Sequence, residues 1–382
     1  MNRLSIRKIN ESNVLREVFN KAPISRADVS KTLELTKSTV YSIFTKLEND
    51  DLIYDIGQGS STRSGGRKPA LTNFNANAGY TINTKINQNS IGCMLNWLDG
   101  STISYQEYPL EGQDVSQRLL ALYQAIKLSQ LDNKDLLGIS VSIYGVVRDN
   151  HVIKANISEL AEYDLVQILQ SRFNVPVLLG NEANMEALYI RDFTQTQTIK
   201  SAVSLSLLDG IGAGIVINGD LYTGNQGEAG EIGHALYYGL KKPVPIEDLC
   251  SDLAVMKQLE KIRGKEIDIV DLRQGFDSED AEVMKILTTF CNGISMVVQN
   301  LILSFDPEKI VISSEILRAI PELLTTIIEN VSPFAHKKTP IVLSDNPEQI
   351  SLLGGCALIT RSVLGLPQGE LVFKNRNVPQ IN

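Results

Sequence analysis

Two short polar segments carry side chains that could bind a polyhydroxy ligand. Asn181-Glu182-Ala-Asn184 follows the apolar run 175–179, which places an amide and a carboxylate at the C-terminal end of an expected strand. Glu231 and His234 stand three residues apart in a glycine-rich loop. Carboxylates accept hydrogen bonds from sugar hydroxyls, whereas amide and imidazole groups can donate them. A lone histidine is more often structural, but two such polar loops in one chain favour a sugar site.

A third segment, Gly210-Ile-Gly-Ala-Gly214, could let backbone amides approach a phosphate group. A tight turn between two strands explains these glycines equally well, and the sequence leaves both interpretations open.

A different chemistry is indicated near the N-terminus, where a short helix is expected from Thr36 to about Asn49. Its outward face carries small hydrogen-bond donors and cations, which are Lys37, Ser38, Thr39, Tyr41, Ser42, Thr45 and Lys46. In a helix-turn-helix, the N-terminal end of the second motif helix enters the major groove, where such side chains reach base edges. A solvated helix face would look similar, but the flanking segments favour DNA binding.

Those flanking segments predict a winged helix-turn-helix. Apolar spacing indicates a helix over 7–20, and Pro23 ends it before Ser25 caps a short second helix. The inward residues of that second helix are expected to be Ala27, Val29 and Leu33. Thr36 can cap the third helix, whose buried stripe is Val40, Ile43, Phe44 and Leu47.

A β-wing is expected next, because strand 52–56 and a strand opening at Leu71 flank a Gly/Ser-rich turn. Its tip, residues 60–69, can lie along a DNA backbone or enter a narrow minor groove. The same stretch could be a flexible interdomain linker, and both roles can hold together. The expected DNA contacts are Ser25, Arg26, Lys37, Ser38, Thr39, Ser42, Lys46, Arg63, Arg67 and Lys68.

After Phe74, strands alternate with longer helices, which predicts an α/β body of two related halves with a ligand cleft between them. The expected strands are 79–86, 91–98, 137–143, 176–180, 202–208, 213–217, 309–313 and 341–343. The expected helices are 114–128, 162–173, 183–192, 251–262, 279–303 and 316–330.

Composition and charge favour a cytoplasmic protein of two or three domains. The 382 residues are 43% hydrophobic and 21% charged, with no apolar run long enough for a membrane helix and no signal-peptide pattern. The four cysteines form no close pair, which argues against disulfides and a cysteine-rich zinc site. Residues 1–74 hold 12 Lys and Arg against 8 Asp and Glu, whereas the remainder holds 24 against 36. A basic head on an acidic body points to a polyanionic partner for the head, although chance variation could produce the same excess.

These motifs together resemble the ROK family (repressors, open reading frames and sugar kinases). Gly227-Glu-Ala-Gly-Glu-Ile-Gly-His234 is the most specific match. Four further segments look most like the xylose-repressor branch, and they are Ile56-Gly-Gln-Gly59, Ser64-Gly-Gly-Arg67 with Pro69, Phe173-Asn-Val-Pro-Val177 and Asn181-Glu-Ala-Asn184. The resemblance covers nearly the whole chain. It implies an α/β fold with a two-lobed, actin-like ATPase body, and an assembly of two or four chains.

The resemblance also implies domain boundaries. We expect the winged helix-turn-helix at 1–74 and a first lobe at 75–185, to which the C-terminal helix 356–366 returns. The second lobe is expected at 186–355.

Departures from the family pattern affect ATP handling. Lys85, Asn87 and Asn89 stand where family kinases have the Asp-x-Gly-x-Thr of the first phosphate loop. The second phosphate loop, usually Gly-Thr-Gly-Ile-Gly, reads Leu208-Asp-Gly-Ile-Gly212, and its aspartate would repel phosphates. A Gly-Gly pair near the adenosine site is replaced by Ser313-Ser314, and the catalytic base, an aspartate in the kinases, is replaced by Glu182. The extra methylene of Glu182 misplaces its carboxylate, so these departures predict that kinase activity is lost.

A further departure concerns metal binding. Family members often have a Cys-x-Cys-Gly-x-x-Gly-Cys stretch that completes a zinc site with the histidine at the position of His234. Residues 237–250 of this chain contain a single cysteine, Cys250. We therefore expect no structural zinc and no cofactor. Glu247 or Asp248 could supply the sugar-binding acid that the zinc loop normally positions. The expected ligand residues are Asn156, Asn181, Glu182, Glu231, His234 and Asp248.

The sequence thus predicts a cytoplasmic regulator of carbohydrate-metabolism genes that binds double-stranded operator DNA and responds to a sugar or sugar derivative. In this family such regulators are most often repressors. We expect a homodimer or tetramer, no membrane association and no enzymatic activity. Two alternatives stay open: an active ROK-type sugar kinase with a DNA-binding head, and a regulator controlled by a protein partner.

Overall fold

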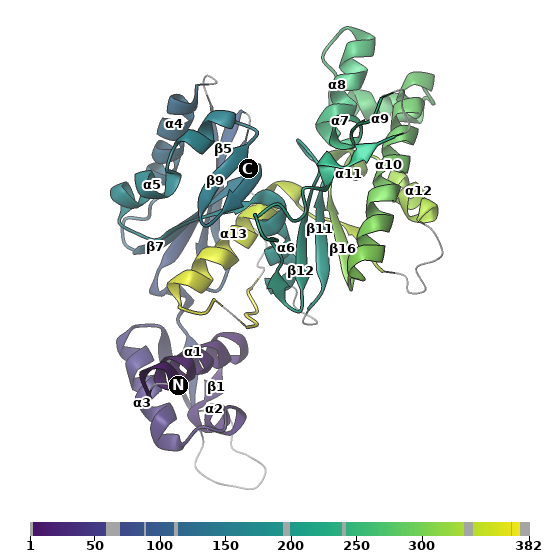
Figure 1. Cartoon of the computed structure of the whole chain (residues 1–382). Helices are drawn as coiled ribbons and strands as arrows, with labels where there is room; N and C mark the ends of the chain where they lie inside the picture. The colour runs from purple at the N-terminus through teal and green to yellow at the C-terminus, as the bar shows by residue number, and fades with distance from the viewer. Residues whose placement is uncertain are drawn as a thin grey trace.

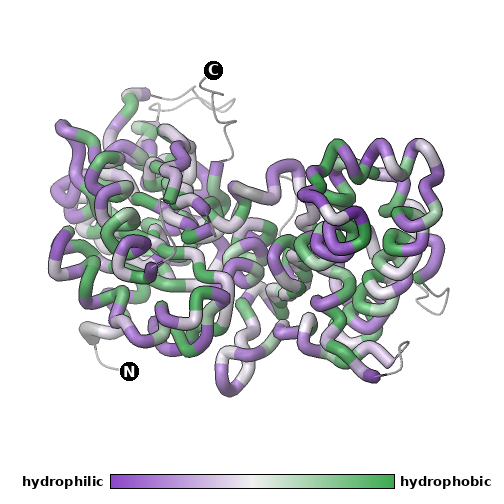
Figure 2. The backbone as a smooth tube through the Cα atoms, turned by 90° about the horizontal axis from the view of Figure 1, so that it is seen from above, coloured by the Kyte–Doolittle hydropathy of each residue, from purple (hydrophilic) through white to green (hydrophobic). Residues whose placement is uncertain are grey.

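The computed structural model describes residues 3–58, 69–87, 89–110, 114–193, 199–238, 242–331, 339–367 and 369–374. A small N-terminal head lies below a larger body, and the body consists of two lobes side by side (Figure 1). Seen from above, the second lobe is separated from the rest by a narrower middle, and its helices alternate between apolar and polar residues (Figure 2).

The head is a helix-turn-helix with a small sheet. Its helices are α1 (Arg3–Lys21), α2 (Arg26–Thr32) and α3 (Lys37–Asn49), and its strands are β1 (Ile24–Ser25), β2 (Ile53–Gln58) and β3 (Ala70–Phe74). Ser25 caps α2 and Thr36 caps α3, as the sequence predicts. The predicted stripe of Val40, Ile43, Phe44 and Leu47 is buried. The short strand β1, which pairs with β3, is not evident in the sequence.

One expectation for the head is wrong, and another concerns residues that the structure does not describe. Ala27 is exposed rather than inward, because Val29 is the residue through which the short α2 packs on the core. The strands β2 and β3 pair as the arms of the expected wing. The tip between them, with Arg63, Arg67 and Lys68, lies outside the described residues.

The first lobe is built on a mixed sheet of strand order β10-β7-β4-β5-β6. Its strands are β4 (Tyr80–Ile86), β5 (Ser90–Trp97), β6 (Thr102–Pro109), β7 (Leu136–Ile143) and β10 (Val177–Asn181). Helices α4 (Val115–Leu128) and α5 (Leu165–Phe173) cover one face. The strand β6 and the hairpin of β8 (Gly145–Arg148) and β9 (His151–Ala155) were not predicted, because their half-exposed residues lack a clear alternating pattern.

The second lobe has a sheet of order β13-β12-β11-β16-β17. Its strands are β11 (Ala202–Ser206), β12 (Gly212–Ile217), β13 (Asp220–Leu221), β16 (Lys309–Ser313) and β17 (Ile341–Leu343). Its helices are α7 (Glu247–Cys250), α8 (Asp252–Arg263), α9 (Ile269–Asp277), α10 (Ala281–Phe305), α11 (Glu315–Ala319) and α12 (Glu322–Asn330). The single helix expected over 316–330 is two helices, because Pro321 separates α11 from α12.

Helix α10 corrects the expectation that no segment could span a membrane. Among the described residues it is the one helix that is long and apolar enough by length and composition. Its apolar side chains, however, form much of the core of the second lobe. A core helix of this kind is weak evidence for a membrane span.

Two helices join the lobes. Helix α6 (Glu182–Asp192) packs on β11 and β12 of the second lobe, and α13 (Pro347–Val363) packs on β4 and β7 of the first lobe. The two helices also pack on each other (Figure 1). A Cβ at Gly354 of α13 would overlap the carbonyl oxygen of Met185 in α6, so this glycine permits the close approach. The sequence predicts this helix at 356–366, whereas α13 begins earlier, at Pro347, and ends at Val363. It contains a pair of glycines, which are unfavourable in an isolated helix.

Candidate functional site

A cavity of about 310 Å³ lies between the two lobes. Five expected ligand residues line it, namely Asn156, Asn181, Glu182, Glu231 and His234. Asp248 does not line it, because its side chain is exposed on α7. The first turn of α7 directs the preceding residue, Glu247, into the cavity instead.

The second lobe contributes a linked set of acids around one histidine. The Nδ1 atom of His234 lies 3.1 Å from Oε1 of Glu247, and its Nε2 atom lies 3.8 Å from Oε2 of Glu231. The other oxygen of Glu247 accepts a hydrogen bond from the Ile211 backbone at 3.4 Å. Burial raises the pKa of Glu231, and the nearby His234 and Lys154 partly oppose this. Two carboxylates and an imidazole facing one space can accept and donate hydrogen bonds with several hydroxyls of one ligand.

Glycines allow this loop to fold back on the strand. The backbone at Gly230 has φ of 95°, a left-handed conformation that favours glycine. A Cβ there would overlap the carbonyl oxygen of Ala213 on β12. This explains why Glu231 and His234 sit in a glycine-rich segment rather than in a regular element.

Asn181 shapes the first-lobe wall of the cavity. Its side-chain oxygen accepts a hydrogen bond from the Asn184 amide at 3.0 Å and so caps α6. Its side-chain nitrogen donates to the carbonyl of Gly145 at 2.7 Å. Asn181 therefore fixes the start of α6 against the β8–β9 hairpin, and part of its hydrogen-bonding capacity is already used.

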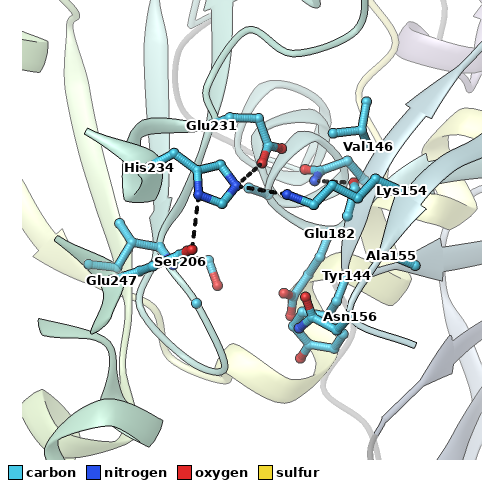
Figure 3. Close-up of a pocket in the computed structure, with 16 residues that line it drawn as sticks. Tyr144, Val146, Lys154, Ala155, Asn156, Glu182, Ser206, Glu231, His234 and Glu247 are labelled. Carbon is cyan, nitrogen blue, oxygen red and sulfur yellow. Dashed lines mark hydrogen bonds and ion pairs between the residues drawn. The ribbon is translucent and has the colours of Figure 1, made fainter. Parts of the chain in front are cut away.

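Lys154 is a cavity residue that sequence reasoning missed. It extends from β9 across the cavity, and its Nζ atom lies 3.3 Å from Nε2 of His234 (Figure 3). A single lysine in an undetected strand gives no motif, so only prediction of the β8–β9 hairpin could have pointed to it. The contact joins the first lobe to the second across the opening.

Lys85 and Glu182 form a buried ion pair at the base of the cleft. The Nζ atom of Lys85 lies 3.5 Å from Oε1 of Glu182, and each side chain is only 4% exposed. The lysine also lies over the ring of Tyr144, 5.5 Å from its centroid. Burial raises the pKa of Glu182, and the Lys85 ammonium opposes this shift. The carboxylate at the position of the kinase base thus faces a fixed cation.

A second cavity of about 480 Å³ adjoins the first and shares Tyr144, Ala155 and Asn156 with it. The expected first phosphate loop contributes Asn87, and the second contributes Asp209. Burial raises the pKa of Asp209, and Lys85 and Lys257 oppose this. Asn89 lines neither cavity and is exposed.

The two serines at the expected adenosine-side position take part in buried hydrogen bonds. Ser313 donates to Glu186 on α6 at 2.9 Å. Ser314 caps α11 and donates to Asp252 at 2.8 Å. Their side chains therefore belong to the packing of the second lobe.

The described residues contain no group of three or more His, Cys, Asp or Glu side chains that could hold a metal ion. All four cysteines are buried and free of disulfides.

The head presents part of the expected DNA-binding face on α3. Lys37, Ser38 and Ser42 are exposed, and Ser38, Thr39 and Ser42 line a groove of about 600 Å³ between α3 and α1. Thr39 is half-buried and shares a hydrogen bond with Thr36 at 2.8 Å.

Other expected DNA contacts have structural partners. Ser25 is only 3% exposed and caps α2, so the expectation that it contacts DNA is wrong. Arg26 pairs with Glu48 at 2.6 Å and lies over the rings of Tyr41 and Phe44. Lys46 pairs with Glu11 of α1 at 2.6 Å.

Known proteins resemble the chain over nearly its full length. The sequence profile of the ROK family matches residues 85–361. A xylose repressor from Lactiplantibacillus pentosus is 35% identical, and the match covers 98% of each chain. The crystal structure of a ROK family transcriptional regulator, a homologue of the Escherichia coli MLC protein, superposes with a TM-score of 0.78 at 22% identity, covering 95% of this chain and 98% of that one. A ROK hexokinase from Thermus thermophilus superposes with a TM-score of 0.62 at 20% identity, covering 73% of this chain and 97% of that one.

Proposed function

This chain belongs to the ROK family, and we propose that it is a DNA-binding repressor whose affinity for its operator is controlled by a sugar. The head would bind DNA through α3 and the wing. The cleft between the lobes would bind the sugar. A full-length relative at 35% identity that is a xylose repressor supports this assignment and makes xylose the first sugar to test.

The observation that carries the proposal is the polar cavity between the lobes in a chain that also carries the head. Glu231, His234 and Glu247 come from the second lobe, and Asn156 comes from the first. A ligand bound to both sets favours one arrangement of the lobes. A ligand shifts an equilibrium only by its difference in affinity between two states, and a site made of two lobes provides such a difference.

We further propose that the protein does not transfer phosphate. A catalytic base must accept a proton from the attacking hydroxyl. The ammonium of Lys85, 3.5 Å from the Glu182 carboxylate, stabilises the ionised form of Glu182 and so opposes that proton transfer. Asp209 would face the phosphates of a nucleotide in the second cavity, where burial strengthens the repulsion. The body thus supports binding of a sugar without supporting its phosphorylation.

A homodimer fits this function, because two heads related by a twofold axis would read the two halves of a pseudo-palindromic operator. The proposed site of action is the cytoplasm, where the operator DNA lies. Helix α3 has 13 residues and is about 20 Å long, which is shorter than the roughly 34 Å between half-site centres. One head would therefore contact one half-site, and a second chain would supply the other.

The test uses the purified full-length chain and a pool of random duplex DNA, from which bound sequences are selected and then measured by fluorescence anisotropy. We expect one pseudo-palindromic sequence to be enriched. Xylose, glucose or N-acetylglucosamine should weaken its binding about tenfold or more, as expected for a coupled effector. Absence of any sequence preference would overturn the DNA-binding assignment.

Two further measurements separate the alternatives. A coupled assay for ADP with the same sugars should give no sugar-dependent turnover, and turnover would establish the kinase alternative. Calorimetry that gives no heat with any pentose, hexose or amino sugar, together with a captured protein partner, would establish control by that partner.

A further inference from the structure

The C-terminal segment that follows α13 lies between the head and the body. Residues 364–367 and 369–374 of this segment are described, and the most buried are Leu366, Leu371 and Phe373, each at most 1% exposed. They belong to one apolar cluster together with head residues of α1 and α3 and body residues of α13. The segment is therefore packed as an integral part of the core and is visible between α13 and the head in Figure 1.

Hydrogen bonds attach this segment to α1 of the head. The side-chain oxygen of Asn20 accepts from the amide of Val372 at 2.9 Å, and its side-chain nitrogen donates to the carbonyl of Glu370 at 2.9 Å. Asn20 thus pairs with the segment in both directions, as a strand neighbour would.

The same segment is attached to the C-terminal end of α6. The amide of Phe373 donates to the carbonyl of Asp192 at 2.9 Å. The Asp192 carboxylate accepts two hydrogen bonds from Arg361 of α13, at 2.7 and 3.0 Å, and both side chains are buried. Arg361 also donates to the carbonyl of Gly369 at 2.8 Å. A bidentate pair of this kind fixes geometry as well as distance.

Aromatic rings continue the connection from the head to α6. The ring centroid of Phe373 lies 5.2 Å from that of Phe19 in α1 and 5.2 Å from that of Phe193 at the end of α6. Tyr189 of α6 stacks on Phe193 at 5.3 Å. These separations lie in the range of favourable aromatic pairs. Phe373 therefore contacts Phe19 of the head and Phe193 of the body.

The other end of α6 lies in the ligand cavity. Glu182 begins the helix and Asn181 caps it, and both line the cavity. A helix transmits a displacement along its axis, because its backbone hydrogen bonds resist stretching and bending. A ligand that moved the start of α6 would therefore move Asp192 and Phe193, and these residues contact Phe373.

We propose that Phe373 is a positioning residue that couples the sugar cavity to the DNA-binding head through α6 and the C-terminal segment. This inference rests on the proposed function and specifies its regulation. Without Phe373, the sugar would still bind and the head would still bind DNA, but each event would lose its effect on the other. Such coupling is reciprocal, so it can be measured from either site.

The test measures operator affinity of the full chain with and without saturating sugar, using whichever of xylose, glucose and N-acetylglucosamine has the largest effect on wild type. We compare wild type with Phe373→Leu, which keeps an apolar side chain but removes the ring contacts. Phe173→Leu is the matched control, because Phe173 pairs with Tyr123 in the first lobe away from this connection. Sugar affinity is measured separately by calorimetry, and folding by circular dichroism.

For Phe373→Leu we expect sugar affinity to stay within about threefold of wild type, while the effect of sugar on DNA binding falls about tenfold or more. Phe173→Leu should keep the full effect. If Phe373→Leu does not fold, Asn20→Ala tests the same route, because it removes the hydrogen bonds on the head side only. A folded variant that retains the wild-type sugar effect overturns the coupling role of Phe373. A wild-type chain that binds DNA without any response to sugar overturns the proposed function instead.

Discussion

Lys85 and Glu182 form a buried ion pair in the cleft, so the carboxylate there faces a cation. Both side chains are nearly excluded from water, and the ion-pair distance is 3.5 Å. Removal of one partner from a buried pair leaves an uncompensated charge, whereas replacement of both by apolar groups is often tolerated. The pair therefore has a testable energetic signature that does not depend on finding the ligand.

We predict that Lys85→Met lowers the free energy of unfolding by about 3 kcal/mol at neutral pH, because Glu182 is left buried and unpaired. The loss should be smaller at acidic pH, where the carboxyl group is protonated. The double variant Lys85→Met, Glu182→Leu should recover much of the stability. Urea unfolding of Lys85→Met, Glu182→Leu and the double variant measures this coupling. Strictly additive losses of stability would contradict the pairing.

Asp252 gives a second prediction, for the dependence of stability on pH. Burial raises its pKa from 3.8 to about 7, although hydrogen bonds from Ser314 and the Glu315 amide oppose the shift. Since the folded-state pKa lies above the unfolded one, this contribution to stability is complete below about pH 4 and is lost as pH rises through about 7. Asp252→Asn cannot ionise, so its stability should improve relative to wild type between pH 5 and pH 8.

Urea midpoints at several pH values measure that difference. The exposed Asp220→Asn serves as the control, and its difference from wild type should stay constant over the same range. A parallel pH dependence of Asp252→Asn and wild type would mean that Asp252 ionises equally in both states.

At the level of elements, the sequence predicts structure well where a cap and a periodic pattern coincide. Both Ser25 and Thr36 begin helices as expected, because local hydrogen bonds to backbone amides decide those positions. The sequence places the start of α13 too late, because Gly354 is unfavourable in an isolated helix. Its presence is explained only by the approach of Met185, a contact between residues far apart in the chain.

For the cavity between the lobes, the sequence likewise predicts the residues that belong to motifs and misses those placed by tertiary structure. Asn181, Glu182, Glu231 and His234 come from recognisable motifs, and the fold brings all of them to one cavity. The choice between Glu247 and Asp248 depends on the rotation of one helical turn, which spacing alone does not determine. Lys154 reaches the cavity through a hairpin that has no sequence signal, so its role follows from tertiary structure alone.

Helix α3 carries the next prediction. Lys37 is exposed at its first turn, whereas Lys46 is held by Glu11. We expect Lys37→Ala to weaken operator binding about tenfold and to reduce the salt dependence of log K by about one unit, because one phosphate contact is lost. The control is Lys200→Ala, which removes the same charge from an exposed site on the body. Equal effects of the two variants would mean that net charge, and not the position on α3, governs binding.

At the scale of the whole molecule, the shape of the cavity between the lobes depends on the packing that holds the two lobes against each other. His234 and Glu247 belong to one lobe and Lys154 and Asn156 to the other, so their separation depends on how α6 packs against α13. Gly354 permits that packing, because a side chain there would overlap the carbonyl oxygen of Met185. A change at Gly354 should therefore reach the cavity even though the residue does not line it.

We predict that Gly354→Ala costs about 1–3 kcal/mol of stability, as overpacking of a filled contact usually does, and also weakens sugar binding. The matched control is Gly92→Ala, where the added methyl would meet its nearest neighbour, the hydroxyl of Tyr105, at an ordinary 3.5 Å. Calorimetry of both folded variants with the sugar that acts on wild type measures the second effect. If Gly354→Ala loses stability but keeps wild-type sugar affinity, the lobes must hold the cavity through contacts other than α6 and α13. If both properties change together, the helix pair is the element that sets the distance between the two halves of the site.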